Sequence, residues 1–206
     1  DLVLRAGFVE KDGTVVLYPM MAENRRLERR LDVLEALSAK HGFRASRVID
    51  LTRHEQTGRY LEGTGSLVLD RVHRVAYACV SPRTDLDVLG DFAQQLDYDI
   101  VAFEALDANG APIYHTNVLM SVGERFAAVC TSAIREDERA AVLDTLQKSG
   151  RAIVELTLEQ MAGFAGNMLE LGSSRTGSVI AMSERARDVL TPAQRVAWLR
   201  LIRTDN

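Results

Sequence analysis

Three polar residues of different chemistry stand at matching places along the chain. Glu62 lies in the segment LEGTGS, His115 in YHTNV and Asn167 in FAGNML, and each precedes a stretch that the sequence predicts to be a strand. A carboxylate, an imidazole and an amide can together orient a polar substrate and move protons. If the three segments are equivalent parts of a repeat, their side chains converge on one mouth. The trio is therefore a candidate active site.

The elements that must position these residues recur along the chain. Each unit is predicted to contain two strands joined by a turn, an amphipathic helix and a closing apolar strand. The centres of the second strands fall at Val16, Ala76, Ala127 and Val179, which are 60, 51 and 52 residues apart. Periods of this length are long for a solenoid and are typical of propeller-like arrays. The sequence thus predicts an α/β fold of ββαβ units around one axis.

Apolar spacing predicts where the helices and closing strands lie. Spacings of three and four residues place Leu27, Leu31 and later leucines on one face of a first helix. The apolar runs that close the units are expected to be buried strands; they are Val48–Ile49, Ile100–Phe103 and Ile153–Val154. The fourth unit differs, because two short helices are expected after its second strand. The second of these begins at a capping box, Thr191-Pro192-Ala193-Gln194.

Composition indicates one globular domain and excludes two classes of partner. Of the 206 residues, 47% are hydrophobic and no low-complexity linker divides them, so residues 1–206 are expected to form a single domain. The arginines of the segment Arg25–Arg30 lie among acidic residues, which predicts a solvated, salt-bridged helix face rather than a nucleic-acid surface. No apolar stretch approaches the length of a membrane span. Neither nucleic acid nor a membrane is expected as a partner.

The two cysteines are predicted to be structural. Cys79 and Cys130 occupy matching places in apolar strands of neighbouring units, where a thiol is usually a small buried hydrophobe. So few cysteines form no disulfide scaffold, which favours a reducing cytoplasm as the setting. The chain contains no pair of cysteines or histidines at a metal-ligand spacing, so neither a metal nor another cofactor is expected.

Four motifs in order resemble a known family. They are LEGTGSLVLDR, AYACVSPRTD, YHTNVLMSVGERFAAVC and QMAGFAGNMLEL, and the similarity extends from about Gly13 to Thr191. Together they resemble the arginine deiminase-related citrulline hydrolases of the pentein superfamily of guanidino-group-modifying enzymes. The resemblance implies a pentein-type, five-bladed α/β propeller of ββαβ blades, of which this chain would hold about four. It also implies a single amidinotransferase-like catalytic domain over residues 1–206, expected to be incomplete at both ends.

The resemblance also implies roles for the candidate residues. Members of the family attack the central carbon of a guanidino or ureido group with a cysteine thiolate. Glu62 matches the carboxylate that grips the substrate's nitrogens, and His115 matches the catalytic acid and base. Arg83, in SPRT, resembles the arginine that pairs with the substrate's α-carboxylate. Asn167 resembles the turn that lines the site.

Two departures from the family pattern bear on the chemistry. Arginine deiminases carry an aspartate two residues after the histidine, whereas this chain has Asn117. A cationic guanidinium favours a second carboxylate, but a neutral ureido group tolerates an amide. The family's nucleophilic cysteine lies in a glycine-rich segment beyond the point where this chain stops, and neither Cys79 nor Cys130 matches it. We therefore expect the 206-residue chain alone to be inert as a catalyst of this type.

Without the resemblance, each candidate has an ordinary structural interpretation. Glu62 can be a turn or cap residue, His115 a buried histidine, and Asn167 a turn residue after a glycine. Arg83 can pair on the surface with Asp85, in the same segment, or with Asp87. The placement of Glu62 and His115 at the openings of successive units favours the functional interpretation.

Three functions remain open at this point. The leading hypothesis is a hydrolase that converts citrulline to ornithine, ammonia and carbon dioxide. The second keeps the fold but takes a guanidine, such as arginine, methylarginine or succinylarginine. The third is an inactive, truncated paralogue that serves as a binding protein. The expected partner is a small molecule in every case, and the sequence leaves the oligomeric state open, with a homodimer among the arrangements considered.

Overall fold

The computed structural model describes residues 3–4, 7–9, 13–173 and 177–202, and these form four separate small sheets. The first unit contains β1 (Val3–Leu4), β2 (Gly7–Val9), β3 (Thr14–Leu17), α1 (Glu23–Arg26), α2 (Leu31–His41) and β4 (Arg47–Asp50). A 3₁₀ helix, η1 (Thr52–Thr57), leads to the second unit, with β5 (Leu67–Asp70), β6 (Val75–Cys79), α3 (Leu86–Leu96) and β7 (Asp99–Phe103).

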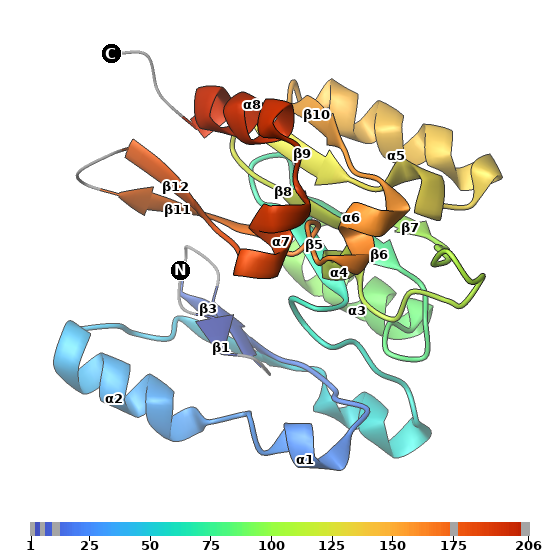
Figure 1. Cartoon of the computed structure of the whole chain (residues 1–206). Helices are drawn as coiled ribbons and strands as arrows, with labels where there is room; N and C mark the ends of the chain where they lie inside the picture. The colour runs from blue at the N-terminus through green and yellow to red at the C-terminus, as the bar shows by residue number, and fades with distance from the viewer. Residues whose placement is uncertain (1–2, 5–6, 10–12, 174–176, 203–206) are drawn as a thin grey trace.

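The third and fourth units complete the chain. The third contains α4 (Thr116–Leu119), β8 (Met120–Val122), β9 (Phe126–Val129), η2 (Thr131–Ala133), α5 (Glu136–Lys148) and β10 (Ala152–Glu155). The fourth contains α6 (Leu158–Ala162), β11 (Leu169–Ser173), β12 (Gly177–Ala181), α7 (Glu184–Val189) and α8 (Pro192–Ile202). Figure 1 shows α1 and α2 at one side of the molecule and α7 and α8 at the other.

The predicted ββαβ unit is confirmed in three of the four sheets. In each, an antiparallel hairpin is followed by a helical crossover to a parallel third strand: β2–β3–β4, β5–β6–β7 and β8–β9–β10. The four predicted centres, Val16, Ala76, Ala127 and Val179, all fall in second strands. The described strands form no closed barrel, because no hydrogen-bonded ladder joins one sheet to the next. The five-bladed ring stays an expectation.

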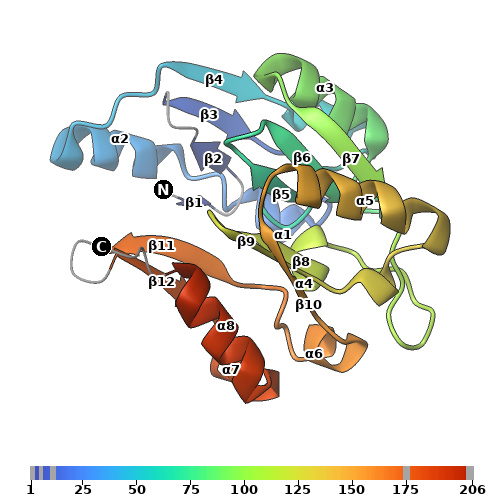
Figure 2. The same ribbon diagram turned by 90° about the horizontal axis from the view of Figure 1, so that it is seen from above.

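Two apolar cores lie between neighbouring units. One joins the first and second units around Tyr18, Leu61 and Phe92. The other joins the second, third and fourth units, and it includes Phe126 with the ring of Trp198 edge-on to it, their centroids 6.5 Å apart. Figure 2 shows α3 and α5 flanking the sheets on the side away from the β11–β12 hairpin. These helices do not cover the first strands β5, β8 and β11, which are therefore free to line a site.

The first predicted helix is wrong in its extent. The chain forms two helices, α1 and α2, separated by a turn, and Leu27 within that turn is 78% exposed. None of the described side chains of α2 is fully buried. A spacing of three and four residues makes an apolar face, but the face is buried only where another element covers it. The side chains of α1 instead bond to polar groups, as the site geometry shows.

The closing strands are less buried than predicted. Val48 in β4 is 53% exposed and Ile100 in β7 is 41% exposed, whereas Ile49, Phe103 and Val154 are buried. Successive side chains of a strand point to opposite faces, and in β4 the exposed Val48 precedes the buried Ile49, so only one face of this strand packs on a core. In the fourth unit the predicted capping box is confirmed, because Thr191 and Gln194 exchange hydrogen bonds between side chain and backbone at the start of α8.

Candidate active site

Glu62 lies at the centre of a polar network between the first three units. Its carboxylate is fully buried, and Oε2 lies 2.8 Å from Nε2 of His115 and 2.6 Å from Nη1 of Arg25. A second guanidinium, that of Arg83, lies 3.4 Å from the same oxygen. Oε1 accepts a 3.1 Å hydrogen bond from the backbone N–H of Met21. The proximity of Glu62 and His115 expected from the repeat is therefore observed, while their catalytic roles stay predictions.

The environment of Glu62 favours its ionised form. Burial pushes the pKa of this carboxyl upward, but the hydrogen bond to His115, the Met21 amide and the charge of Arg25 outweigh it, so the net pKa lies below the usual value. An ionised carboxylate only accepts hydrogen bonds, so Nε2 of His115 must be the donor. In the neutral ring, Nδ1 then carries the lone pair that can take a proton.

Close contacts and backbone hydrogen bonds fix the loops that carry Glu62 and His115. The ring of His115 lies so close to Gly65 that an added Cβ would come within 2.8–2.9 Å of three ring atoms. Beside it, the N–H of Asn117 donates to the Gly65 carbonyl at 3.2 Å. The Thr116 hydroxyl donates to the Ser66 carbonyl at 2.5 Å. A glycine is thus required where the second unit meets the imidazole.

The predicted solvated face is wrong for the arginines of α1 and of the turn after it. Arg25, Arg26 and Arg29 do not form a solvated face but reach inward to two carboxylates. Arg25 binds Glu62, while Arg26 and Arg29 approach Glu55 at 3.2 and 2.5 Å. A buried carboxylate needs a partner, and these arginines supply it. The pairs join residues 26 to 37 positions apart in the chain, which local charge patterning does not reveal.

Arg83 joins the network instead of the surface. Its guanidinium contacts Glu62 and lies over the ring of Tyr114, 5.1 Å from the centroid. The alternative surface partners are engaged elsewhere: Asp85 caps α3 by accepting from backbone amides, and Asp87 pairs with Arg59. The Arg83 side chain is 34% exposed, so it lies at the rim of the network, where a ligand can reach it.

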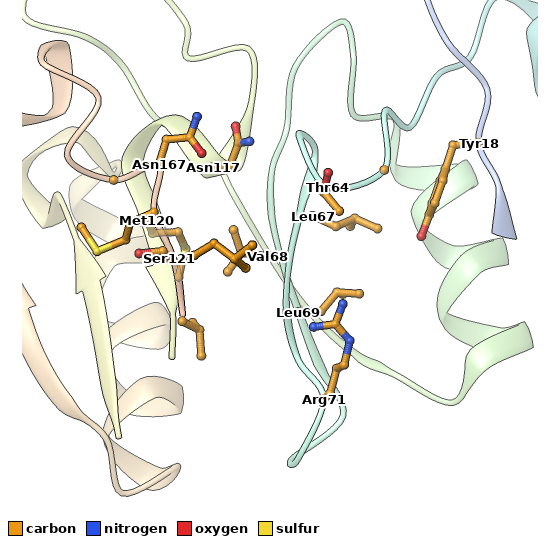
Figure 3. Close-up of a pocket in the computed structure, with 15 residues that line it drawn as sticks. Tyr18, Thr64, Leu67, Val68, Leu69, Arg71, Asn117, Met120, Ser121 and Asn167 are labelled. Carbon is orange, nitrogen blue, oxygen red and sulfur yellow. The ribbon is translucent and has the colours of Figure 1, made fainter. Parts of the chain in front are cut away.

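A pocket of about 230 Å³ lies beside this network, between the first strands of the second, third and fourth units. Asn117 and Asn167 lie side by side at one end of it, Thr64 lies across from them, and Arg71 lies at the opposite end (Figure 3). Between the ends the wall is largely apolar and includes Leu67, Val68, Met120 and Met168. No acidic side chain lines the pocket among the described residues.

The predicted site residues therefore divide into two adjoining groups. Glu62, His115 and Arg83 share the network, whereas Asn117 and Asn167 line the pocket. Glu62 and His115 do not themselves line the pocket, although their chain neighbours Gly63, Thr64 and Asn117 do. The network and the pocket are therefore adjacent through these chain neighbours.

Gly166 allows the segments that carry Asn117 and Asn167 to pack closely, and we predict that a side chain at this position separates them. A Cβ at this position would lie 2.5 Å from the carbonyl oxygen of Val118 and 2.8 Å from the carbonyl carbon of Leu119. Because both atoms belong to backbone, Gly166→Ala must push the fourth unit away from the third. We expect a loss of about 1–3 kcal/mol of unfolding free energy, measured by urea denaturation.

Gly90→Ala is the matched control for this prediction. A Cβ at Gly90 meets nothing within 4 Å, and the residue lies inside α3. Alanine favours a helix over glycine by about 0.8–1.0 kcal/mol. The control should therefore be neutral or stabilising. An equal loss of stability in both variants would contradict the close contact at Gly166.

The predicted burial of both cysteines is confirmed. Cys79 donates to the carbonyl of Ile113 at 3.4 Å, and Cys130 lies 3.5 Å from the hydroxyl of Ser132. Burial raises the pKa of the Cys79 thiol to about 12 and also raises that of Cys130. A nucleophilic cysteine needs a thiolate at neutral pH. Neither residue is suited to that role.

The described residues also bear on metals and membranes. Across residues 13–173 and 177–202, no three His, Cys, Asp or Glu side chains are grouped so that they could hold a metal ion. In the same part of the chain, every helix is too short or too polar to cross a membrane.

Comparison with known proteins finds one matching family and several solved structures of similar fold. Residues 6–202 match the family model for N,N dimethylarginine dimethylhydrolase, eukaryotic. No curated protein sequence gives a significant match. Among solved structures, the N-terminal domain of ArgZ, an arginine dihydrolase from the ornithine-ammonia cycle in Cyanobacteria, was determined bound to substrate. It is similar over 98% of this chain and 65% of its own, with a TM-score of 0.68 and 20% identity.

Two further structures share the fold. The ternary complex of AgrE with ornithine and NAD⁺ aligns over 98% of this chain and 26% of its own, with a TM-score of 0.70 and 18% identity. A dimethylarginine dimethylaminohydrolase adduct with S-methyl-L-thiocitrulline aligns over 98% and 66%, with a TM-score of 0.55 and 14% identity. The chain thus spans less than two thirds of each of these structures. At such identities the likeness shows the mixed α/β fold.

Proposed function

Because the chain belongs to the N,N dimethylarginine dimethylhydrolase family, we propose that it functions as a hydrolase of a guanidino or ureido group and that its preferred substrate is citrulline. The products would be ornithine, ammonia and carbon dioxide, with one water consumed. The pentein-type ring of five blades is proposed as the complete fold. The pocket between the first strands of three successive units supports that arrangement.

The character of the pocket supports a neutral head group. Asn117 and Asn167 form its polar end, and none of its described lining residues is acidic. An amide side chain offers both a donor and an acceptor, so a pair of them can bond the C=O and the N–H groups of a ureido group. A guanidinium has only donors and a positive charge, and it would leave the amide NH₂ groups facing other donors. This is the observation on which the choice of citrulline depends.

The network beside the pocket would supply the proton chemistry. We propose that Nδ1 of His115 takes the proton of the attacking cysteine thiol, gives it to the departing nitrogen, and later deprotonates the water that clears the covalent intermediate. Glu62 would hold the ring by accepting from Nε2. Arg83, exposed at the rim, would bind the substrate's α-carboxylate bidentately. The attacking thiolate must come from outside the described residues, because Cys79 and Cys130 are buried with raised pKa values.

A guanidine substrate is the second candidate. ArgZ is an arginine dihydrolase, and an AgrE variant has been determined in complex with L-arginine. These proteins share the fold with this chain, which supports a substrate with an amino-acid tail. These two proteins favour arginine, or a methylated or succinylated arginine, as the substrate. The chemistry of the pocket favours citrulline instead.

Binding of the two amino acids to Asn117 variants tests the proposal. Citrulline should bind the wild-type chain more tightly than arginine in calorimetric titrations. Asn117→Asp places a carboxylate at the amide end, so we expect arginine to gain about tenfold in affinity and citrulline to lose affinity, since a hydrogen bond to a charged group contributes about 1.5–3 kcal/mol.

Asn109→Asp is the control for charge alone, because Asn109 is exposed in the turn of residues 107–110. It should leave both affinities unchanged. Tighter binding of arginine than of citrulline by the wild-type chain would support the guanidine candidate instead. If neither amino acid binds, the pocket is not the substrate site.

A further inference from the structure

The carboxylate of Glu62 is paired with two guanidinium groups. Those of Arg25 and Arg83 contact it at 2.6 and 3.4 Å. Arg25 also lies 3.5 Å from a second carboxylate, that of Glu28, through its Nε. The network adjoins a pocket that has no acidic lining residue in the described part of the chain. A cationic head group entering this pocket would find the Glu62 carboxylate already paired with Arg25.

Arg25 differs from Arg83 in how it is held. It lies on α1, a four-residue helix without a fully buried residue, and only 27% of its side chain is exposed. The neighbouring arginines anchor the same segment independently. Arg26 donates to the carbonyl of Met20 at 3.0 Å, and Arg29 donates to that of Tyr18 at 3.0 Å. Arg25 is thus not needed for core packing, and its shortest contact is with Glu62 at 2.6 Å, compared with 3.5 Å to the more exposed Glu28.

We propose that Arg25 is a specificity-determining residue, which neutralises Glu62 and thereby makes the site select an uncharged ureido group over a cationic guanidinium. The proposal rests on the proposed function, since it concerns the same site. Removing the Arg25 charge leaves Glu62 less neutralised, and a buried carboxylate with one partner fewer attracts a cation. In this arrangement an arginine substrate would be disfavoured, because the Arg25 guanidinium already occupies the Glu62 carboxylate.

The test compares citrulline and L-arginine binding by calorimetry in the wild-type chain and three variants. Arg25→Gln removes the charge and retains a hydrogen-bonding side chain, whereas Arg25→Lys retains the charge. Arg29→Gln is the matched control, because Arg29 lies close to Arg25 but contacts Glu55. We expect the ratio of arginine to citrulline affinity to rise about tenfold in Arg25→Gln. It should stay within about threefold of wild type in Arg25→Lys and Arg29→Gln.

The outcomes separate this inference from the proposed function. If both amino acids bind and the ratio does not change in Arg25→Gln, the role of Arg25 is wrong and the proposed function stands. If neither binds any of the four proteins, both are wrong. An equal rise of the ratio in Arg29→Gln would assign the effect to the net charge of the segment and would also overturn the role of Arg25.

A measurement on the unmodified chain covers the case in which Arg25→Gln does not fold. The Nη–H signals of Arg25 in nitrogen-15 NMR spectra report whether its ion pair with Glu62 persists, because Nη1 is the atom that contacts Glu62. We expect the signals to remain on saturation with citrulline. Their loss on citrulline binding would show that the substrate displaces Arg25 from Glu62, which would overturn the proposal.

Discussion

Replacing His115 with alanine is expected to lower the rate of hydrolysis by about 10²–10⁴-fold, the usual contribution of a positioned acid and base. The imidazole is held by Glu62 through Nε2 and by the close approach of Gly65, so its Nδ1 is presented in one orientation. The measurement is ammonia release from citrulline and from arginine, by protein from the complete coding sequence. Circular dichroism should show the fold of the variant unchanged.

Glu62→Gln separates the role of the imidazole from that of the charge that holds it. Glutamine has nearly the same shape but cannot hold an ion pair with Arg25, and its amide presents a donor as well as an acceptor to Nε2. The wild-type carboxyl has a lowered pKa, so its charge is present at neutral pH and the substitution removes it. We expect a smaller loss of rate than in His115→Ala. Activity of His115→Ala within about threefold of wild type would contradict the assignment.

The repeat could be predicted from sequence because it is written in local patterns. Strand centres, the hairpins and the capping box at Thr191 depend on neighbours a few residues away. A repeat also carries equivalent residues to equivalent places, which is why Glu62 and His115 could be expected to meet across 53 positions of sequence. The repeat therefore predicts this proximity without knowledge of any individual contact.

The surroundings of the pair could not be predicted in the same way. The inward direction of Arg25 depends on how α1 packs against the second unit, because its contact with Glu62 joins residues 37 positions apart. Likewise the exposure of Leu27 and Val48 depends on which faces another element covers. Local charge patterning favours a solvated arginine face, whereas the burial of Glu55 and Glu62 requires the opposite.

The largest effect on stability is expected at an ion pair outside the site. Arg151, the residue before the third unit's closing strand β10, binds both carboxylate oxygens of Asp70 at the end of β5, with Nη2 3.0 Å from Oδ1. Its Nε donates to the carbonyl of Gly123 at 2.6 Å. The two side chains are only 5% and 1% exposed. The pair therefore joins the second and third units, whose loops carry Glu62 and His115.

Arg151→Met should lower the unfolding free energy by about 3–5 kcal/mol, because it removes the guanidinium from a buried carboxylate and leaves it only the His73 ring and the backbone amides of the turn. Arg135→Met is the control: Arg135 pairs with Glu104 and Asp137 on the surface, and such pairs contribute about 0–1 kcal/mol. Urea denaturation at neutral pH measures both variants. A loss below about 1 kcal/mol in Arg151→Met would contradict the inference that the pair stabilises the junction.

The pH dependence gives this prediction a second, independent check. Burial pushes the pKa of Asp70 upward, but the His73 amide and the hydrogen bond from Arg151 outweigh it, so the folded-state pKa lies below the ordinary value. Stability from this group is therefore present above the unfolded pKa of about 3.9 and is lost as the pH falls through the lower folded value. In Arg151→Met the Asp70 carboxylate loses one of the groups that lower its pKa, so it protonates at a higher pH and its penalty is relieved on acidification. The difference between wild type and variant should thus be largest near neutral pH and should shrink below about pH 4. A difference that stays constant over this range would show that the loss comes from packing of the Arg151 side chain rather than from its charge.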